Sequence, residues 1–261
     1  MAGRPHILAE TALGPERRVE CEVAILPWGA TEPHNLHLPF GTDTVQAEAV
    51  AAEAAGRAAA RGASVSVLPG IPLGANAQQL DTPLTLNLNP STQALILRDI
   101  VQSLDRHAVG KLLVLNGHGG NDFRQMVREL QPHASLFICC TNWWTVLNGR
   151  EYFVDPGDHA GELESSVMMH LRPDLVLPLD RAGSGRARRF RMEWLRDGTA
   201  WAPRDWARVS NDTGVGDPRE ADPEKGANFF HDVCEKLADF LVHLSAADVD
   251  DLYEDSDSGP T

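Results

Sequence analysis

Short continuous apolar stretches alternate along the chain with longer stretches in which apolar residues recur at intervals of three and four. Continuous apolar stretches bounded by turn residues are typical of buried strands, and the longer periodic stretches are typical of helices. Thr42 or Asp43 is expected to cap the first helix. The pattern predicts strands at residues 21–29, 63–70, 111–121 and 134–144, and helices at residues 42–62, 89–110, 122–131 and 227–246.

This alternation of strand and helix predicts an α/β fold, in which consecutive parallel strands are joined by right-handed crossovers. We expect a three-layer sandwich with a mostly parallel central sheet and helices on both faces. Residues 1–247 are predicted to form a single domain of this kind. Functional sites in such folds form in the loops at the carboxyl ends of the strands, so these loops are the first place to look for chemistry.

The formal net charge of −14 argues against binding to duplex nucleic acid, because contacts with phosphates require a positive face. Six of the acidic residues lie in residues 248–261, which contain no base and are expected to be disordered, and the rest of the chain carries −8. No apolar run is long enough to cross a membrane, the N-terminus lacks the pattern of a secretory signal, and the four cysteines form no CxxC pair. We therefore expect a cytoplasmic protein without a membrane partner.

Residues of the types that bind metals gather in the loop after the first predicted strand, which reads "GATEPHNLHLPFGTD" and contains Glu32, His34 and Asp43. The third predicted strand leads into "LNGHGGN", which contains His118. Because the carboxyl ends of parallel strands meet at one edge of a sheet, these side chains are expected to lie close together. Imidazole and carboxylate groups are common ligands of zinc, manganese and iron.

A third cluster, "DPGDHAGELESSVMMH", follows the fourth predicted strand and contains Asp158, His159, Glu162 and Glu164. Its second half opens a predicted helix. Glu162 and Glu164 are two positions apart, so on a helix they face different directions and at most one is expected to reach a shared site. The other is expected to be a helix cap or a solvated charge.

Each of these features also has an ordinary structural explanation. A lone E-x-H sequence is often a solvated loop, and a glycine-rich turn often serves only to allow positive φ angles. Three clusters at three strand ends argue against coincidence. His37 is expected to be structural, at least one of Trp143 and Trp144 is expected in the core, and residues 180–214 are expected to form a solvated excursion or a subunit contact.

Four motifs taken together resemble the creatininase family of metal-dependent amidohydrolases. They occur in the family's order and span about residues 21–240, and jointly they are specific, although "NGHGGN" alone is not. They read "GATEPHNLHLPFGTDTVQAEAVA", "LNGHGGN", "HAGELESS" and "TGVGDPREADPEKG".

The resemblance implies a centre of two divalent metal ions, with zinc as the first expectation and manganese or iron as alternatives. The family's ligand positions correspond here to Glu32, His34, Asp43 and His118, and Asp43 is the expected bridging carboxylate. Members of the family are commonly hexameric, so the resemblance also implies a homo-oligomer.

One departure from the creatinine-cleaving members concerns the second metal. Those members resemble N-G-H-x-E, whose glutamate binds the second ion, but Gly120 stands at that position here. Glu164 aligns with a glutamate of the family's H-A-G-E-x-E-T element and is the expected replacement ligand and catalytic group. His159 is then expected to act as an acid or base beside the substrate.

A second departure lies in "GANAQQLDTPLTLNL", which resembles the loop that faces the substrate in the family. The family usually shows S-x-E-H followed by F-P-G-T, and neither sequence is present. Creatinine is therefore a doubtful substrate. The residues expected to bind the substrate are Asn76, Gln78, Gln79, Trp144 and Asp158.

The predicted function is hydrolysis of a C–N bond other than a peptide bond, in a small molecule such as an amide, cyclic amide or formamide. The implied nucleophile is a hydroxide that bridges the two ions, and His159 is expected to deliver a proton to the leaving nitrogen. Two alternatives remain open at this point: a related hydrolase acting on a carbonyl substrate derived from a carbohydrate or cyclitol, and a non-catalytic binding protein that has kept the fold.

Overall fold

The computed structural model describes residues 4–14 and 20–254. In this part of the chain, a sheet of parallel strands has the order β2-β1-β3-β4. The observed strands are shorter than the apolar stretches that predict them, because each stretch continues into a turn. Their bounds are β1 (Val23–Trp28), β2 (Val65–Val67), β3 (Lys111–Asn116) and β4 (Phe137–Asn142).

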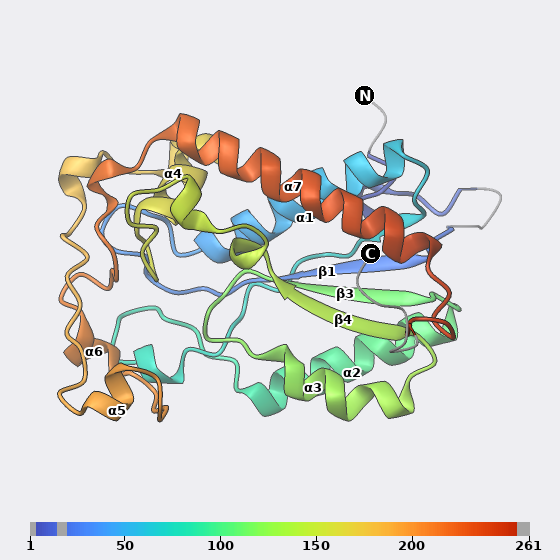
Figure 1. Ribbon diagram of the computed structural model, residues 1–261, viewed down its shortest axis with the longest axis horizontal. Coiled ribbons are helices and arrows are strands. Elements are labelled where there is room, and N and C mark those ends of the chain that lie inside the picture. The colour runs from blue at the N-terminus through green and yellow to red at the C-terminus, as the bar shows by residue number, and fades with distance from the viewer. Residues whose placement is uncertain (1–3, 15–19, 255–261) are drawn as a thin grey trace.

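Helices cover both faces of the sheet, so the predicted three-layer α/β fold is confirmed. In Figure 1, α1, α4 and α7 lie on one side of the strands, and α2 and α3 lie on the other. The short helices α5 and α6 belong to a long excursion between α4 and α7. The bounds are α1 (Thr42–Ala60), α2 (Pro90–Arg106), α3 (Phe123–Leu130), α4 (Glu162–Leu171), α5 (Glu193–Arg196), α6 (Trp206–Val209) and α7 (Pro223–Ala246).

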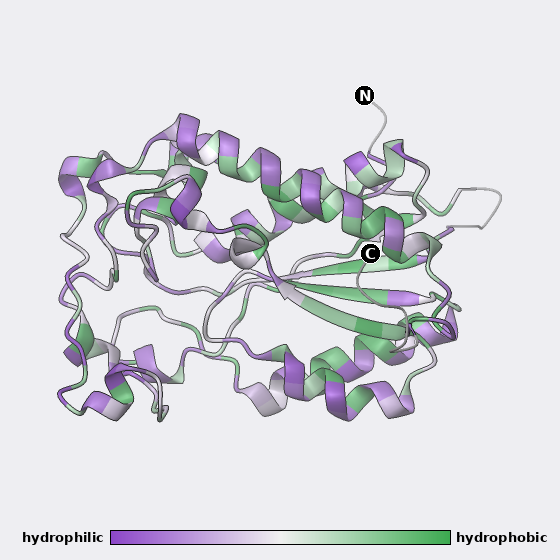
Figure 2. Cartoon of the chain, in the orientation of Figure 1, coloured by the Kyte–Doolittle hydropathy of each residue, from purple (hydrophilic) through white to green (hydrophobic). Residues whose placement is uncertain are grey.

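The central strands are buried on both faces, which explains why their sequences are continuously apolar rather than alternating. Val23 and Ile25 of β1 pack in a core with α1 and α7. Ala24 and Leu26, on the opposite face of the same strand, pack in a second core with α2 and α3. Figure 2 shows the corresponding hydrophobic strands between helices that carry many hydrophilic residues.

Two glycines bring the first turn of α1 against the ends of two neighbouring strands. A Cβ atom at Gly29, directly after β1, would lie 2.5 Å from the backbone nitrogen of Thr44. One at Gly117, directly after β3, would lie 2.6 Å from the backbone oxygen of Asp43. Because neither position has room for a side chain, α1 begins in direct contact with the carboxyl edge of the sheet.

The predicted cap of α1 is wrong. The N-cap residue is Gly41, and no side chain in the described part of the chain caps this end. Thr42 and Asp43 are the first residues of the helix itself. The carboxylate of Asp43 is not available to cap the backbone because it faces two histidines across the sheet edge.

Past α7, residues 248–254 form no helix or strand and are exposed, while the remainder of the predicted acidic tail, residues 255–261, lies outside the described residues. None of the helices described here is both long enough and apolar enough to cross a lipid bilayer.

Candidate metal centre

A first group of possible metal ligands forms where β1, β3 and α1 meet. It comprises Glu32, Asp43 and His118, all buried. The Nδ1 atom of His118 lies 2.9 Å from Oε1 of Glu32 and 3.0 Å from Oδ2 of Asp43. Both carboxylate oxygens are buried and have no hydrogen-bond partner among the described residues. A single ring nitrogen thus faces two buried carboxylate oxygens, which makes this group a candidate cation site.

A second group shares Asp43 with the first and adds His34 and Glu164. The Nε2 atom of His34 lies 2.9 Å from Oδ1 of Asp43. Asp43 therefore turns one oxygen toward His34 and the other toward His118. This is the arrangement that a carboxylate needs in order to bridge two ions.

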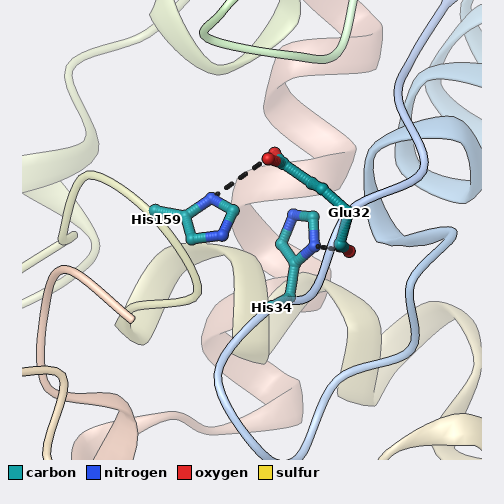
Figure 3. Close-up of side chains that lie close together, drawn as sticks. All are labelled: Glu32, His34 and His159. Atoms are coloured by element: carbon teal, nitrogen blue, oxygen red, sulfur yellow. Dashed lines mark hydrogen bonds and ion pairs between the residues drawn. The ribbon is translucent and has the colours of Figure 1, made fainter. Parts of the chain in front are cut away.

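His159 lies at the edge of the same centre, beside Glu32 and His34. Figure 3 shows its ring nitrogen directed at the carboxylate of Glu32, with the ring of His34 next to it. The distance from Nδ1 of His159 to Oε1 of Glu32 is 3.7 Å, and the centroids of the two histidine rings are 4.3 Å apart.

Backbone carbonyl groups fix the orientation of all three histidine rings. Nδ1 of His34 donates to the carbonyl of Glu32 at 3.0 Å, and Nε2 of His118 contacts that of Ala75 at 3.2 Å. Nε2 of His159 donates to the carbonyl of Pro33 at 3.0 Å. A carbonyl can only accept, so in each neutral ring the other nitrogen carries the free lone pair. Those nitrogens are the ones that face the carboxylates, as metal ligation requires.

The charges at the centre are strongly coupled. Burial disfavours a charged His34, but the carboxylate of Asp43 outweighs this effect and raises the pKa of His34 to about 10. In the same way, Glu32 and Asp43 raise the pKa of His118 well above its ordinary value against the effect of burial. Without metal, protons on these two histidines therefore balance the buried carboxylates. Divalent ions would supply the same positive charge.

Glu164 differs from the other two carboxylates. Its residue is only partly buried, and one carboxylate oxygen accepts a 2.5 Å hydrogen bond from the backbone nitrogen of Ala160. Burial of the carboxyl group raises the pKa of Glu164. The donor set of three carboxylates and two or three imidazoles fits zinc, manganese or iron.

The profile of one protein family, described as "Creatininase: Creatinine amidohydrolase", matches residues 14–241 of the chain. The chain belongs to the creatininase family. It is thus a creatininase-family hydrolase that carries candidate metal ligands.

Several relatives cover nearly the whole chain. One solved structure, from Bacteroides fragilis NCTC 9343, is described as a candidate creatinine amidohydrolase. It is 42% identical to this chain and has a TM-score of 0.89, and the match covers 95% of this chain and 98% of that chain. The mycofactocin precursor peptide peptidase of Mycolicibacterium smegmatis is 30% identical over 227 residues, 83% of each chain. A mutant creatininase described as the Zn–Zn type is 25% identical, with a TM-score of 0.77 over 94% of this chain and all of its own.

This chain departs from the N-G-H-x-E pattern at Gly120, and the space around Gly120 gives the steric reason. A Cβ atom at Gly120 would lie 2.3 Å from the carbonyl oxygen of Ala75 and 2.4 Å from Nε2 of His118. With the backbone in its observed conformation, there is therefore no room for a glutamate side chain at this position. Glu164 occupies the second group instead, where the sequence predicts a replacement ligand.

A cavity of about 840 Å³ opens over the centre and is lined by Glu32, Asp43 and His118. Most of the expected substrate-binding residues line it as well: Gln78, Gln79, Trp144 and Asp158. Asn76 does not. It is fully buried, and its side-chain nitrogen donates to the carbonyl of Leu86 at 3.1 Å, while its Oδ1 has no hydrogen-bond partner among the described residues.

Arg204 and Trp206 are among the cavity residues that were not anticipated from the sequence. Trp206 packs edge to face against His159, with ring centroids 5.4 Å apart and an interplanar angle of 90°. The guanidinium of Arg204 lies over the Trp206 ring at 4.6 Å and pairs with Asp158 at 2.6 Å. The segment around them has no helical or strand periodicity, so the sequence offers no signal beyond its content of tryptophan and arginine.

Three further residues have structural surroundings. His37 bonds to Ser165 at 2.8 Å, and Trp143 lies in the core beside Phe229, as expected. Glu162 is neither a cap nor a solvated charge, and that prediction is wrong. Its buried carboxylate pairs with Lys225 of α7 at 2.7 Å.

Proposed function

We propose that this creatininase-family hydrolase uses two divalent ions, most readily zinc, to cleave a C–N bond of an amide. One observation carries the proposal: the two oxygens of Asp43 face His34 and His118, which belong to different ligand groups. Glu32 and His118 would complete the first ion's ligands, and His34 and Glu164 those of the second. Paired divalent ions activate water as a nucleophile and stabilise negative charge that develops on a carbonyl oxygen.

The side chains around the ions have separate tasks in this proposal. His159 exchanges a proton with the leaving nitrogen through Nδ1, because Nε2 is held by the carbonyl of Pro33. Trp206, packed on the His159 ring, limits the directions in which that ring can turn. Trp144 and Gln78 line the cavity and contact the rest of the substrate.

The leading candidate is a non-peptide amide, cyclic amide or formamide. A peptide bond is the second candidate, and the cavity favours it. A volume of about 840 Å³ lies near the upper end of the roughly 300–1,000 Å³ that is usual for pockets holding drug-sized ligands. That is more space than a small cyclic amide such as creatinine fills, and one relative is a precursor peptide peptidase.

Elemental analysis of the purified protein, wild type beside Asp43→Ala, tests the metal centre. We expect about two ions per chain in the wild type and a loss of both in the variant, because Asp43 contributes to both ligand groups. A wild-type protein without bound metal, and unable to take up zinc, would contradict the proposal and favour a non-catalytic binding protein.

Hydrolysis assays with the zinc-loaded protein then separate the substrate classes. Cyclic amides, formamides and short peptides are compared with hydroxyl-rich esters and lactones as the representatives of a carbohydrate-derived substrate. Cleavage of amides but not of the oxygen esters supports C–N hydrolysis. Faster turnover of peptides than of every small amide would establish the second candidate.

A further inference from the structure

Gln79 stands apart from the other polar residues of the cavity loop. It ends the short 3-10 turn Ala77–Gln79 between β2 and α2, and the residue is only 1% exposed although it borders the cavity. Its amide Nε2 donates a hydrogen bond to Oε2 of Glu32. Its neighbour Gln78 also borders the cavity but is only partly buried, so adjacent residues of the same type have different surroundings.

The hydrogen bond from Gln79 gives the two carboxylate oxygens of Glu32 different surroundings. Oε2 accepts the hydrogen bond from the Gln79 amide. Oε1 lies 2.9 Å from Nδ1 of His118 and is without a hydrogen-bond partner among the described residues. Rotation of the carboxylate about its last bond would exchange these surroundings. The amide therefore holds Glu32 in the one orientation that presents Oε1 to the first ligand group.

An amide is also electrically suited to this position. A lysine or arginine donor would neutralise Glu32 and compete with a metal ion for its charge. The neutral amide of Gln79 satisfies one oxygen and leaves the full negative charge of Glu32 for the cation. Carboxylates that bind metals are commonly oriented by such hydrogen bonds, and loss of one typically weakens metal binding by about 10–100-fold.

The turn that carries Gln79 is itself held from within the loop. The backbone nitrogen of Gln79 donates to the carbonyl of Asn76 at 2.9 Å, and that of Thr82 donates to Gln79 at 2.9 Å. Asn76 is anchored in turn, because its backbone nitrogen donates to Oδ1 of Asn87 at 2.8 Å and its side chain donates to the carbonyl of Leu86 at 3.1 Å. The buried Asn76 thus supports the turn.

We propose that Gln79 is a positioning residue that orients Glu32 as a ligand of the first ion, and that it does not bind the substrate. This inference rests on the proposed function, in which Glu32, Asp43 and His118 hold a divalent ion. It assigns different roles to two consecutive glutamines, with Gln78 free to contact substrate and Gln79 committed to the metal centre.

The test compares Gln79→Met with Gln78→Met. Methionine has nearly the shape of glutamine, so each substitution removes amide groups while leaving the volume almost unchanged. Zinc affinity is measured by competition with a chelator, at a temperature where thermal unfolding shows every variant to be folded. We expect Gln79→Met to weaken binding of one ion by about 10–100-fold, while Gln78→Met binds both ions like the wild type.

A second measurement does not depend on metal. In the metal-free protein, nitrogen-15 NMR of the histidine side chains should show changed signals of His118 in Gln79→Met, because Glu32 Oε1 lies against its Nδ1. Gln78→Met should leave them unchanged. Unaltered zinc affinity together with unaltered His118 signals in Gln79→Met would overturn the inference. A wild-type protein that takes up no zinc would instead overturn the proposed function, and the His118 signals would still decide the role of Gln79.

Discussion

The two ligand groups share Asp43 but are built on different parts of the fold. In the first group, Glu32 and His118 lie in the loops after β1 and β3, where the first turn of α1 contacts the strand ends. The second depends on Glu164, which comes from α4, outside the sheet, and the residue as a whole is only partly buried although its carboxyl group is buried. Ligands fixed by neighbouring strands need little rearrangement on binding. For the proposed two-ion centre, the contrast predicts that the first ion binds more tightly and that binding of the second depends on the placement of α4.

The largest expected effects come from removing one ligand of each group. His118→Ala should weaken the first ion by more than about 100-fold, which exceeds the cost of losing a hydrogen-bond partner of a ligand. Glu164→Ala should affect the second ion alone and leave one tightly bound zinc per chain. Chelator competition combined with elemental analysis measures both. Loss of both ions in Glu164→Ala would show that the groups are not separable.

Substitutions at the adjacent glycines Gly119 and Gly120 test how His118 is positioned in the first ligand group. Gly120→Ala should displace the ring of His118 and lower the affinity of the first ion by about 10–100-fold. Gly119→Ala is the matched control, because a Cβ atom at Gly119 would meet none of the described residues within 4 Å. Equal zinc affinities in the two variants would mean that the close contacts at Gly120 do not position His118.

The placement of α4 can be tested at its partly buried ion pair with α7. Lys225→Met leaves the carboxylate of Glu162 buried without its cation, which for fully buried pairs costs about 3–5 kcal/mol. The Lys225 side chain is 34% exposed, so we expect a loss of about 2 kcal/mol in unfolding free energy, measured by urea denaturation. The second ion should weaken and the first should not.

The double variant Glu162→Gln with Lys225→Met is the control for this effect. Removing both charges should restore part of the stability, since no buried charge is left without a partner. A double variant less stable than Lys225→Met alone would contradict the ion-pair explanation.

A further effect on the second ion is expected from pH. Because Asp43 raises the pKa of His34 to about 10, the metal-free protein carries a proton on His34 at neutral pH, and the second ion must displace it. Its affinity should therefore rise by about tenfold per pH unit between pH 7 and 9 for one proton released. Calorimetry in two buffers of different ionisation enthalpy measures this release. Binding without proton release would contradict it.

The raised pKa of His34 has the opposite effect on the stability of the metal-free protein, which should fall as the pH rises. The pair of His34 and Asp43 stabilises the metal-free protein fully below pH about 6.5, where the unfolded histidine is also protonated. That contribution declines as the pH rises toward the folded-state pKa of about 10. Metal loading should remove this dependence, since the ion replaces the proton.

Much of the fold and the core of the candidate site could be predicted because they depend on local sequence. Continuous apolar stretches mark the strands, and parallel strands necessarily bring the residues that follow them, such as Glu32 and His118, to one edge. The periodic apolar residues of α7 mark the face that packs on α1 and the sheet.

The features that sequence reasoning missed depend on contacts between distant segments. Glu162 finds Lys225 only because α7 crosses α4, and Trp206 reaches His159 only because the excursion folds back over the centre. Gln79 was expected to contact the substrate because its loop resembles a substrate-facing one, and the sequence did not predict its hydrogen bond to Glu32. Its hydrogen bond to Glu32 joins positions 47 residues apart, and no local pattern records which of two adjacent glutamines turns inward.

The close approach of α1 to the strand ends at Gly29 and Gly117 makes the metal centre part of the folding unit itself. In the proposed centre, Asp43 could not leave either ion without the first turn of α1 moving away from β1 and β3, which carry the core of the domain. Each ion should then act as a ligand of the native state alone, adding about 2.7 kcal/mol to the unfolding free energy at 100 times its dissociation constant. For this protein a chelator would behave as a mild denaturant of the whole domain, and the supply of metal would set how much of it survives heating.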